Sequence, residues 1–193
     1  MLRGLYDWTM KWAAHPHALA ALFVVAFVES SIFPIPPDIL IIPMVLASRE
    51  KAWRIAAVCT VASVLGGLAG YGIGYFLYES VGRPLLDFYG YGTQFSAFQA
   101  RYNEWGAWIV AGAGLTPFPY KVITIASGVT GLDIVVFSLA SLASRGLRFF
   151  VEAALLWRFG SPIRDFVETH LNRLAILFFV LLLGGFLALR FVF

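Results

Sequence analysis

The chain has 193 residues, of which 60% are hydrophobic and only 13% are charged, and its mean hydropathy is +0.81. Soluble domains carry about 25% charged residues, so these values exclude an ordinary soluble protein and predict an integral membrane protein. The net charge of +3 does not indicate nucleic-acid binding, because the basic residues fall between apolar segments rather than on one solvated face.

The N-terminal segment, residues 1–17, mixes apolar and aromatic residues with Arg3, Asp7 and Lys11. This pattern predicts an amphipathic helix lying on the membrane surface. We expect residues 18–160 to form one membrane core, and residues 161–193 to form a cytoplasmic loop and a C-terminal transmembrane helix.

The first part of the core, about residues 18–48, is apolar on both sides of a proline-rich break. The arm after the break, 39–47, reaches only about 14 Å as a helix, well short of the ~30 Å hydrocarbon core of a bilayer. We therefore expect a re-entrant hairpin that enters and leaves on the same side. The break contains Pro34, Pro36 and Pro37.

A second break of the same kind follows in the other half of the chain, within residues 105–132. It contains Pro117 and Pro119. Both breaks read Pro-x-Pro-x-charge, and the charged residue is Asp38 in the first and Lys121 in the second. Broken apolar segments at matching places in two halves are typical of transporters built from inverted repeats. The predicted fold is all-α, with two facing re-entrant hairpins.

Three further segments are predicted to span the membrane: 55–78, 134–157 and 174–189. With the first hairpin open to the cytoplasm, the loop 79–104 lies outside, and most basic residues lie inside, as the positive-inside rule requires. The first span carries small residues on one stripe, which favours close helix packing; these are Gly66, Gly67, Gly70 and Gly74.

Six charged residues lie in or beside apolar segments, where each costs at least about 2.5 kcal/mol near the bilayer centre unless it is paired or hydrated. We take them as the candidate substrate-binding and transport residues: Glu29, Asp38, Lys121, Arg145, Arg148 and Glu152. The last three share one helical face. A structural ion-pair network is one interpretation. In the functional interpretation, the arginines bind phosphate and the carboxyl groups of Glu29 and Asp38 carry protons.

Nothing in the sequence predicts an enzyme, a bound metal or a cofactor. Cys59 is the only cysteine, and no Ser–His–Asp, His-x-x-x-His or cysteine cluster offers nucleophilic or metal chemistry. We expect a small buried thiol at Cys59. A homo-oligomer is compatible with the sequence.

The segment from Glu29 to Asp38 resembles the acidic-proline signature of the DedA family, also called the SNARE-associated or VTT-domain family, and is nearest to its YqaA-like branch. The glycine-rich helix 66–74, the second proline break and the stretch 145–149 resemble later blocks of that family. The resemblance covers roughly residues 20–160. At the second break, where the better-studied branch usually has two arginines, this chain has Thr116 and Lys121.

The resemblance implies two hairpins that meet head-on in the bacterial inner membrane and a role in moving lipids between leaflets. It implies undecaprenyl phosphate or a phospholipid as cargo, and proton coupling in some members. By the same resemblance, Glu29 and Asp38 match acidic positions, and Arg145 and Arg148 match basic ones. Two other functions stay open: a proton-coupled carrier of a small soluble anion, and a membrane scaffold that transports nothing.

Overall fold

The computed structural model describes residues 17–32, 36–116, 118–160 and 162. Every element within these residues is helical, and they contain no strand, which confirms the predicted all-α class. The expected surface helix at residues 1–17, except for His17, lies outside the described residues, as do the third expected span at 174–189, Pro34 and Pro117.

The helices follow one another with short connections. In chain order they are α2 (Ala18–Ser31), α3 (Asp38–Ala47), α4 (Ala52–Leu77), α5 (Arg83–Tyr89), α6 (Gly92–Leu115) and α7 (Tyr120–Val129), followed by the last described helix, Ile134–Gly160. A 3₁₀ turn at Arg49–Lys51 directly precedes α4, and a π turn at Tyr78–Gly82 joins α4 to α5. Arg49–Tyr89 is therefore one continuous helix.

Two helices are long and apolar enough to cross a membrane, judged by length and composition. They are Arg49–Tyr89, in which an 18-residue stretch has a mean hydropathy of 1.7, and Ile134–Gly160, in which such a stretch has a mean hydropathy of 1.6. They contain the predicted spans 55–78 and 134–157. The helices α2, α3 and α7 are apolar but have only 14, 10 and 10 residues.

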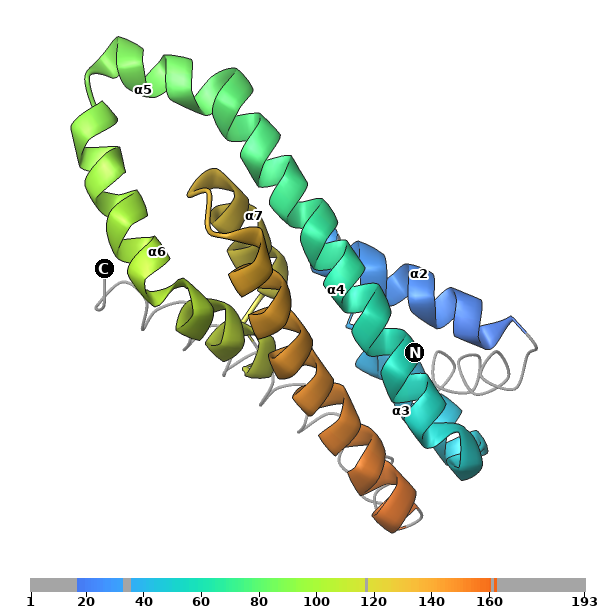
Figure 1. The fold of residues 1–193 in the computed structure, drawn as a ribbon. Coiled ribbons are helices and arrows are strands. Elements are labelled where there is room, and N and C mark those ends of the chain that lie inside the picture. Colours follow the sequence, from blue (N-terminus) through green and yellow to red (C-terminus); the bar gives the residue numbers. More distant parts are fainter. Residues whose placement is uncertain (1–16, 33–35, 117, 161, 163–193) are drawn as a thin grey trace.

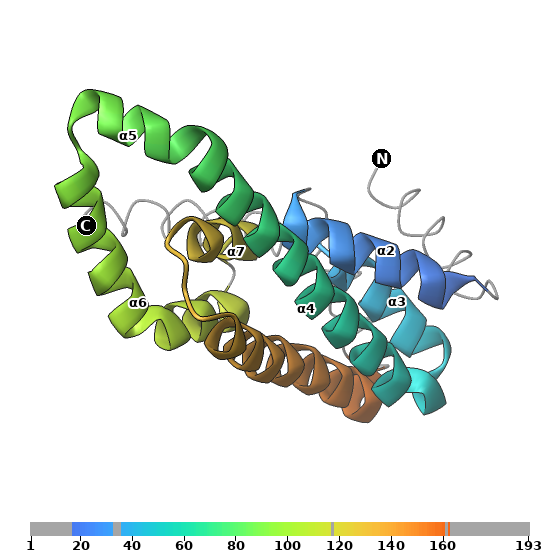
Figure 2. The same cartoon turned by 45° about the horizontal axis from the view of Figure 1, so that its top comes forward.

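The long helix α4 is the centre of the fold. Figures 1 and 2 show α2 on one side of it, and α6, α7 and the last described helix on the other. The last described helix runs antiparallel to α4: Phe137 packs on Tyr71, with ring centroids 5.4 Å apart, and Trp157 packs on Trp53 at 6.2 Å. This pairing gives the Arg145 and Arg148 face a fixed position beside α2 and α3.

The glycine stripe of α4 packs against α2, which precedes the first proline break, and against α7, which follows the second. A Cβ at Gly66 would collide with the backbone of Phe27 in α2, and one at Gly74 would collide with the backbone of Ile125 in α7. Gly67 lies against Tyr120 and Phe137, and Gly70 against Thr124. All four glycines are buried, because their missing side chains let the helix backbones approach closely.

The two proline breaks end one helix and begin another. Pro37 precedes α3, and its carbonyl accepts the N–H of Ile41 at 3.0 Å, which begins the helix. At the second break, Thr116 and Pro119 are extended. Because proline has no N–H and fixes φ, it suits a helix start but not a helix interior. The breaks therefore separate α2 from α3 and α6 from α7, as the sequence predicts.

The arm before the second break is longer than expected. The sequence predicts apolar arms of 105–115 and 122–132, whereas α6 has 24 residues and begins at Gly92, and α7 spans Tyr120–Val129. The polar part of α6 packs on the end of α7, since the Tyr102 hydroxyl bonds that of Ser127 at 3.0 Å. Apolar content alone missed this part, because its helix is stabilised by polar contacts, and the predicted loop 79–104 is largely helical.

Candidate functional site

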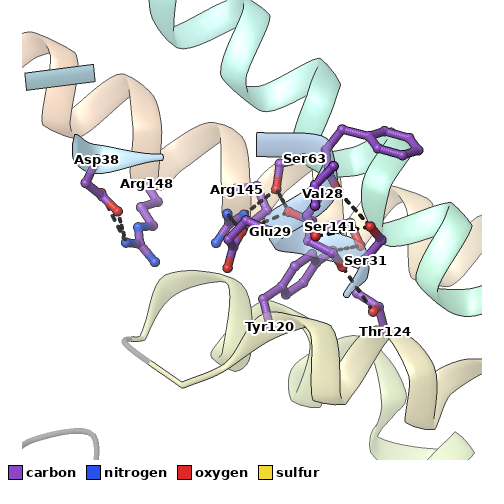
Figure 3. A network of polar contacts seen from close by, with 12 residues as sticks. Val28, Glu29, Ser31, Asp38, Ser63, Tyr120, Thr124, Ser141, Arg145 and Arg148 are labelled. Atoms are coloured by element: carbon purple, nitrogen blue, oxygen red, sulfur yellow. Dashed lines mark hydrogen bonds and ion pairs between the residues drawn. The ribbon is translucent and has the colours of Figure 1, made fainter. Parts of the chain in front are cut away.

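Arg145 and Glu29 form a buried ion pair between the last described helix and α2 (Figure 3). The Arg145 Nη2 atom donates to Glu29 Oε2 at 3.1 Å, and its Nε donates to Ser63 Oγ on α4 at 2.7 Å. The Arg145 side chain is only 2% exposed and that of Glu29 is 16% exposed. A buried guanidinium needs such partners, because an unpaired charge in a low-dielectric interior is costly.

Aromatic rings and hydroxyls enclose the same arginine. Its guanidinium carbon lies 4.8 Å from the ring centroid of Tyr120 and 4.6 Å from that of Phe149, both within cation–π range. The Ser63 hydroxyl is also 2.7 Å from that of Ser30. Arg145 is thus held from several directions and has little freedom to move.

Arg148 and Asp38 form a second ion pair, one helical turn further along the last described helix. Arg148 Nη2 lies 3.2 Å from Asp38 Oδ1 and 3.1 Å from Oδ2. Asp38 opens α3, where the positive end of the helix dipole stabilises a carboxylate. With side chains 28% and 25% exposed, this pair is more open than the Glu29–Arg145 pair.

The two remaining predicted site residues have different surroundings. Glu152 is half-buried on the last described helix, one turn after Arg148. Lys121 is half-buried on α7 and forms no ion pair among the described residues. Although Asp38 and Lys121 carry opposite charges at the two breaks, Asp38 pairs with Arg148 in the structure. Of the break residues, Pro37 is buried, and Pro36 and Pro119 are half-buried.

Sequence reasoning missed a set of buried hydroxyl groups around the site. Tyr120 donates its hydroxyl hydrogen to Ser141 Oγ. Thr124 Oγ1 lies 2.9 Å from the Lys121 carbonyl of its own helix and 3.3 Å from the Ser30 carbonyl of α2, and its one hydrogen is shared between these two acceptors. Tyr120 and Thr124 lie in or beside the second break and reach across to other elements (Figure 3). The available signal was the presence of serine, threonine and tyrosine inside apolar helices, where a hydroxyl needs a partner.

Two relatives show where the chain belongs. It is 34% identical over 168 residues to a protein of Haemophilus influenzae (strain Rd) that is described as uncharacterized, and the alignment covers 85% of this chain and 87% of that protein. It is 36% identical over 168 residues to a protein of Histophilus somni, likewise described as uncharacterized, with the same coverage. The chain belongs to the family of these two proteins. No family model matches the chain, and no solved structure matches it.

The site combines the buried Glu29–Arg145 ion pair with the more exposed Asp38–Arg148 ion pair, and both arginines lie on the same helix face. No group of three or more His, Cys, Asp or Glu side chains that could hold a metal occurs in the part of the chain that the structure describes. Arginine offers a planar set of donors that bonds carboxylate and phosphate in the same bidentate way. Arg148 therefore has the chemistry to bind an oxyanion. Arg145, which bonds Glu29 of α2 and Ser63 of α4, holds the neighbouring helices together.

Proposed function

We propose that this protein is a multi-pass membrane transporter that moves a phosphate-headed lipid, such as undecaprenyl phosphate or a phospholipid, between the leaflets of the bacterial plasma membrane. The two long apolar helices and the low charge content support the membrane setting. The resemblance of residues 20–160 to the DedA family supports the lipid cargo.

The open Asp38–Arg148 pair is the observation that carries the proposal. A guanidinium bound to a carboxylate can exchange it for a phosphate, since both oxyanions accept two parallel hydrogen bonds. The pair lies directly after the first proline break. Irregular backbone in a membrane is tolerated only inside protein or beside a water-filled cavity, so a hydrated headgroup path at this break is physically consistent.

We further propose that α2 with α3 and the end of α6 with α7 are two re-entrant hairpins related as inverted repeats. Each consists of two helices separated by a proline break, and α3 and α7 have 10 residues each, too few to cross a bilayer. Both α2 and α7 pack on the glycine stripe of α4. In transporters of this kind the substrate site lies between the repeats, where the two arginines are.

Translocation of undecaprenyl phosphate in proteoliposomes tests the lipid function. We expect the native chain to move the lipid and Arg148→Gln to lose that activity. Arg83→Gln is the matched control, because Arg83 pairs with Glu79 at an exposed site, with side chains 64% and 44% exposed. Full activity of a folded, membrane-inserted Arg148→Gln variant contradicts the assigned role of Arg148.

A scaffold function is the second candidate, because both arginines of the site are already paired with carboxylates. The charge-swapped double variant Asp38→Arg with Arg148→Asp separates the two. A scaffold needs only an ion pair and should tolerate the swap, whereas a transporter needs the guanidinium on the last described helix and should lose activity. Uptake of inorganic phosphate into the vesicle lumen would instead indicate the soluble-anion carrier.

A further inference from the structure

Exposed aromatic side chains on α4 are spaced to match a lipid bilayer. Trp53 lies near the start of α4 and packs on Trp157 of the last described helix, whereas Tyr75 lies near the end of α4; all three side chains are exposed. The 22 helical steps from Trp53 to Tyr75 correspond to about 33 Å, close to the ~30 Å hydrocarbon core. Tryptophan and tyrosine favour the two membrane interfaces, so this is the spacing of one membrane-crossing segment.

The same spacing places the buried ion pair of the site at the centre of the bilayer. Residue 64 is halfway between Trp53 and Tyr75, and the neighbouring Ser63 accepts a hydrogen bond from Arg145 Nε at 2.7 Å. Transporters built from inverted repeats have their sites near the bilayer midplane. The placement agrees with the proposed function, and the present inference rests on the membrane setting of that function.

The continuous helix Arg49–Tyr89 is too long for the bilayer. Its 41 residues measure about 61 Å, about twice the thickness of the hydrocarbon core. Most of the excess follows Tyr75 and consists of the π turn and α5. Figures 1 and 2 show α5 turned away from the axis of α4, and a π turn is a known cause of such a bend. The helix therefore changes direction where it leaves the bilayer.

Contacts at both ends of α5 hold it in this bent position. Tyr78 in the π turn stacks on Phe95 of α6, with ring centroids 5.0 Å apart. At its other end α5 stops at Gly90, whose φ of 72° is in the left-handed region that glycine favours. The Tyr91 N–H then bonds the Leu86 carbonyl at 2.9 Å. The direction of α5 is thus set by packing against α6 as well as by the π turn.

α5 has one apolar and one charged face, and both are exposed. Leu85, Phe88 and Tyr89 lie on the apolar face; at 82%, Phe88 is the most exposed large apolar side chain in the described part of the chain. Arg83 and Asp87 lie on the opposite face and are also exposed. An apolar face opposite a charged one is typical of a helix that lies in the plane of the membrane interface.

The apolar face of α5 is continuous with the exposed apolar surface of α4. Between Tyr75 and α5 the side chains of Phe76, Leu77 and Val81 are exposed, so that apolar surface extends through the π turn. An exposed apolar patch of this kind marks an interaction surface. Because the adjoining part of α4 already contacts lipid, the lipid that surrounds α4 is the partner that the continuity of this surface favours.

We propose that α5 binds the membrane surface at the C-terminal end of α4, with the side chains of Leu85, Phe88 and Tyr89 inserted among the lipid headgroups and the charged side chains of Arg83 and Asp87 in water. Such a helix fixes the depth of α4 in the bilayer. If α4 moved along the membrane normal, the apolar face of α5 would leave the interface for water or its charged face would enter lipid. The ion pair at Ser63 is thereby held at the midplane.

Spin labels on single cysteines test this in the full-length protein, reconstituted into liposomes of phosphatidylethanolamine and phosphatidylglycerol. Oxygen concentrates in lipid, whereas nickel ethylenediaminediacetate stays in water. We expect the label at Phe88→Cys to collide mainly with oxygen and the label at Asp87→Cys mainly with the nickel complex. The two neighbouring residues are a matched pair, because both are exposed but lie on opposite faces. Cys59 is fully buried, so the introduced thiol is the one that reacts.

The lipid control is Leu65→Cys, an exposed position near the middle of the membrane-crossing part of α4, where oxygen should dominate. Leu85→Cys repeats the measurement on the apolar face of α5 if Phe88→Cys does not fold. With Leu65→Cys in lipid, access of the nickel complex to the label at residue 88 shows that α5 projects into water and overturns the proposal.

Protection of the label at residue 88 from both reagents shows that protein covers this face, and also overturns the proposal. Access of the nickel complex at Leu65→Cys would show that α4 does not cross the bilayer, so that the membrane setting of the proposed function fails together with the proposal. The control thus separates a failure of the interfacial helix from a failure of the proposed function.

Discussion

Arg145 and Glu29 lie 116 residues apart in the sequence, yet the Arg145 Nη2 and Glu29 Oε2 atoms are 3.1 Å apart, and the arginine side chain is 2% exposed. Removing one partner of such a pair leaves a buried charge and costs about 3–5 kcal/mol. We therefore expect Glu29→Gln to lower the unfolding temperature of the purified protein markedly, whether or not transport is assayed.

The double variant Glu29→Gln with Arg145→Met is the control for this prediction. Replacing both charges removes the unpaired guanidinium, and buried pairs are often replaceable in this way at little net cost. We expect it to recover most of the lost stability. Glu79→Gln breaks an exposed pair, which is worth about 0–1 kcal/mol. An equal loss in Glu79→Gln and Glu29→Gln would contradict the difference in burial.

Gly66 and Gly72 on α4 offer a matched pair of substitutions. A Cβ at Gly66 would collide with the Phe27 backbone of α2, whereas a Cβ at Gly72 meets nothing within 4 Å. Alanine is favoured over glycine within a helix by about 1 kcal/mol, so Gly72→Ala should be neutral or stabilising. Gly66→Ala should be destabilising, because backbone must move. Thermal unfolding of both variants checks this, and equal behaviour would contradict the packing of α2 on α4.

Tyr120 and Ser141 provide a test of the buried hydroxyl groups. The Tyr120 hydroxyl donates to Ser141 Oγ, and both residues are buried. Leaving one partner unsatisfied costs about 1–3 kcal/mol. We expect Tyr120→Phe and Ser141→Ala each to be destabilising, and the double variant to lose less than their sum. Additive effects in this double-mutant cycle would show that the two groups are not coupled.

Cysteine labelling tests the proposed re-entrant hairpin. Cys59 is fully buried, so the native chain should react with a maleimide only after unfolding. Against that background, His17→Cys before α2 and Glu50→Cys after α3 place single reactive thiols at the two ends of the hairpin, where both native residues are exposed. Labelling of both from the same side of the membrane supports re-entry. Labelling from opposite sides would show that the segment spans the bilayer.

Local rules predicted much of the secondary structure. Proline has no N–H and disfavours a helix interior, so the breaks before Asp38 and Tyr120 follow from chemistry that acts over a few residues. Pro43, in contrast, lies inside α3, so a single proline does not always end a helix. The shared face of Arg145 and Arg148 likewise follows from helical periodicity. The extent of α6 does not, because its polar first part, 92–104, is held by contacts such as the Asn103 side-chain amide bonded to the Thr130 carbonyl at 3.1 Å.

The partners of the charged residues could not be predicted in the same way. Asp38 has both Lys121 and Arg148 as reasonable partners by charge, and only the antiparallel packing of the last described helix on α4 brings Arg148 to it. Periodicity gives the face of a helix but not its rotation against a neighbour, which is set by side-chain volumes along the interface.

At Gly70, α4 packs against α2 and α7 at the same point. The Thr124 side chain of α7 lies against this glycine, and the Thr124 hydroxyl, which is 2.9 Å from the Lys121 carbonyl, is also 3.3 Å from the Ser30 carbonyl of α2. If α2 slides along α4, the packing of α7 against α4 at Gly70 therefore changes as well. Thr124 thus joins the helix after the second proline break to the helix before the first, and a displacement of one helix changes the fit of the other at this point.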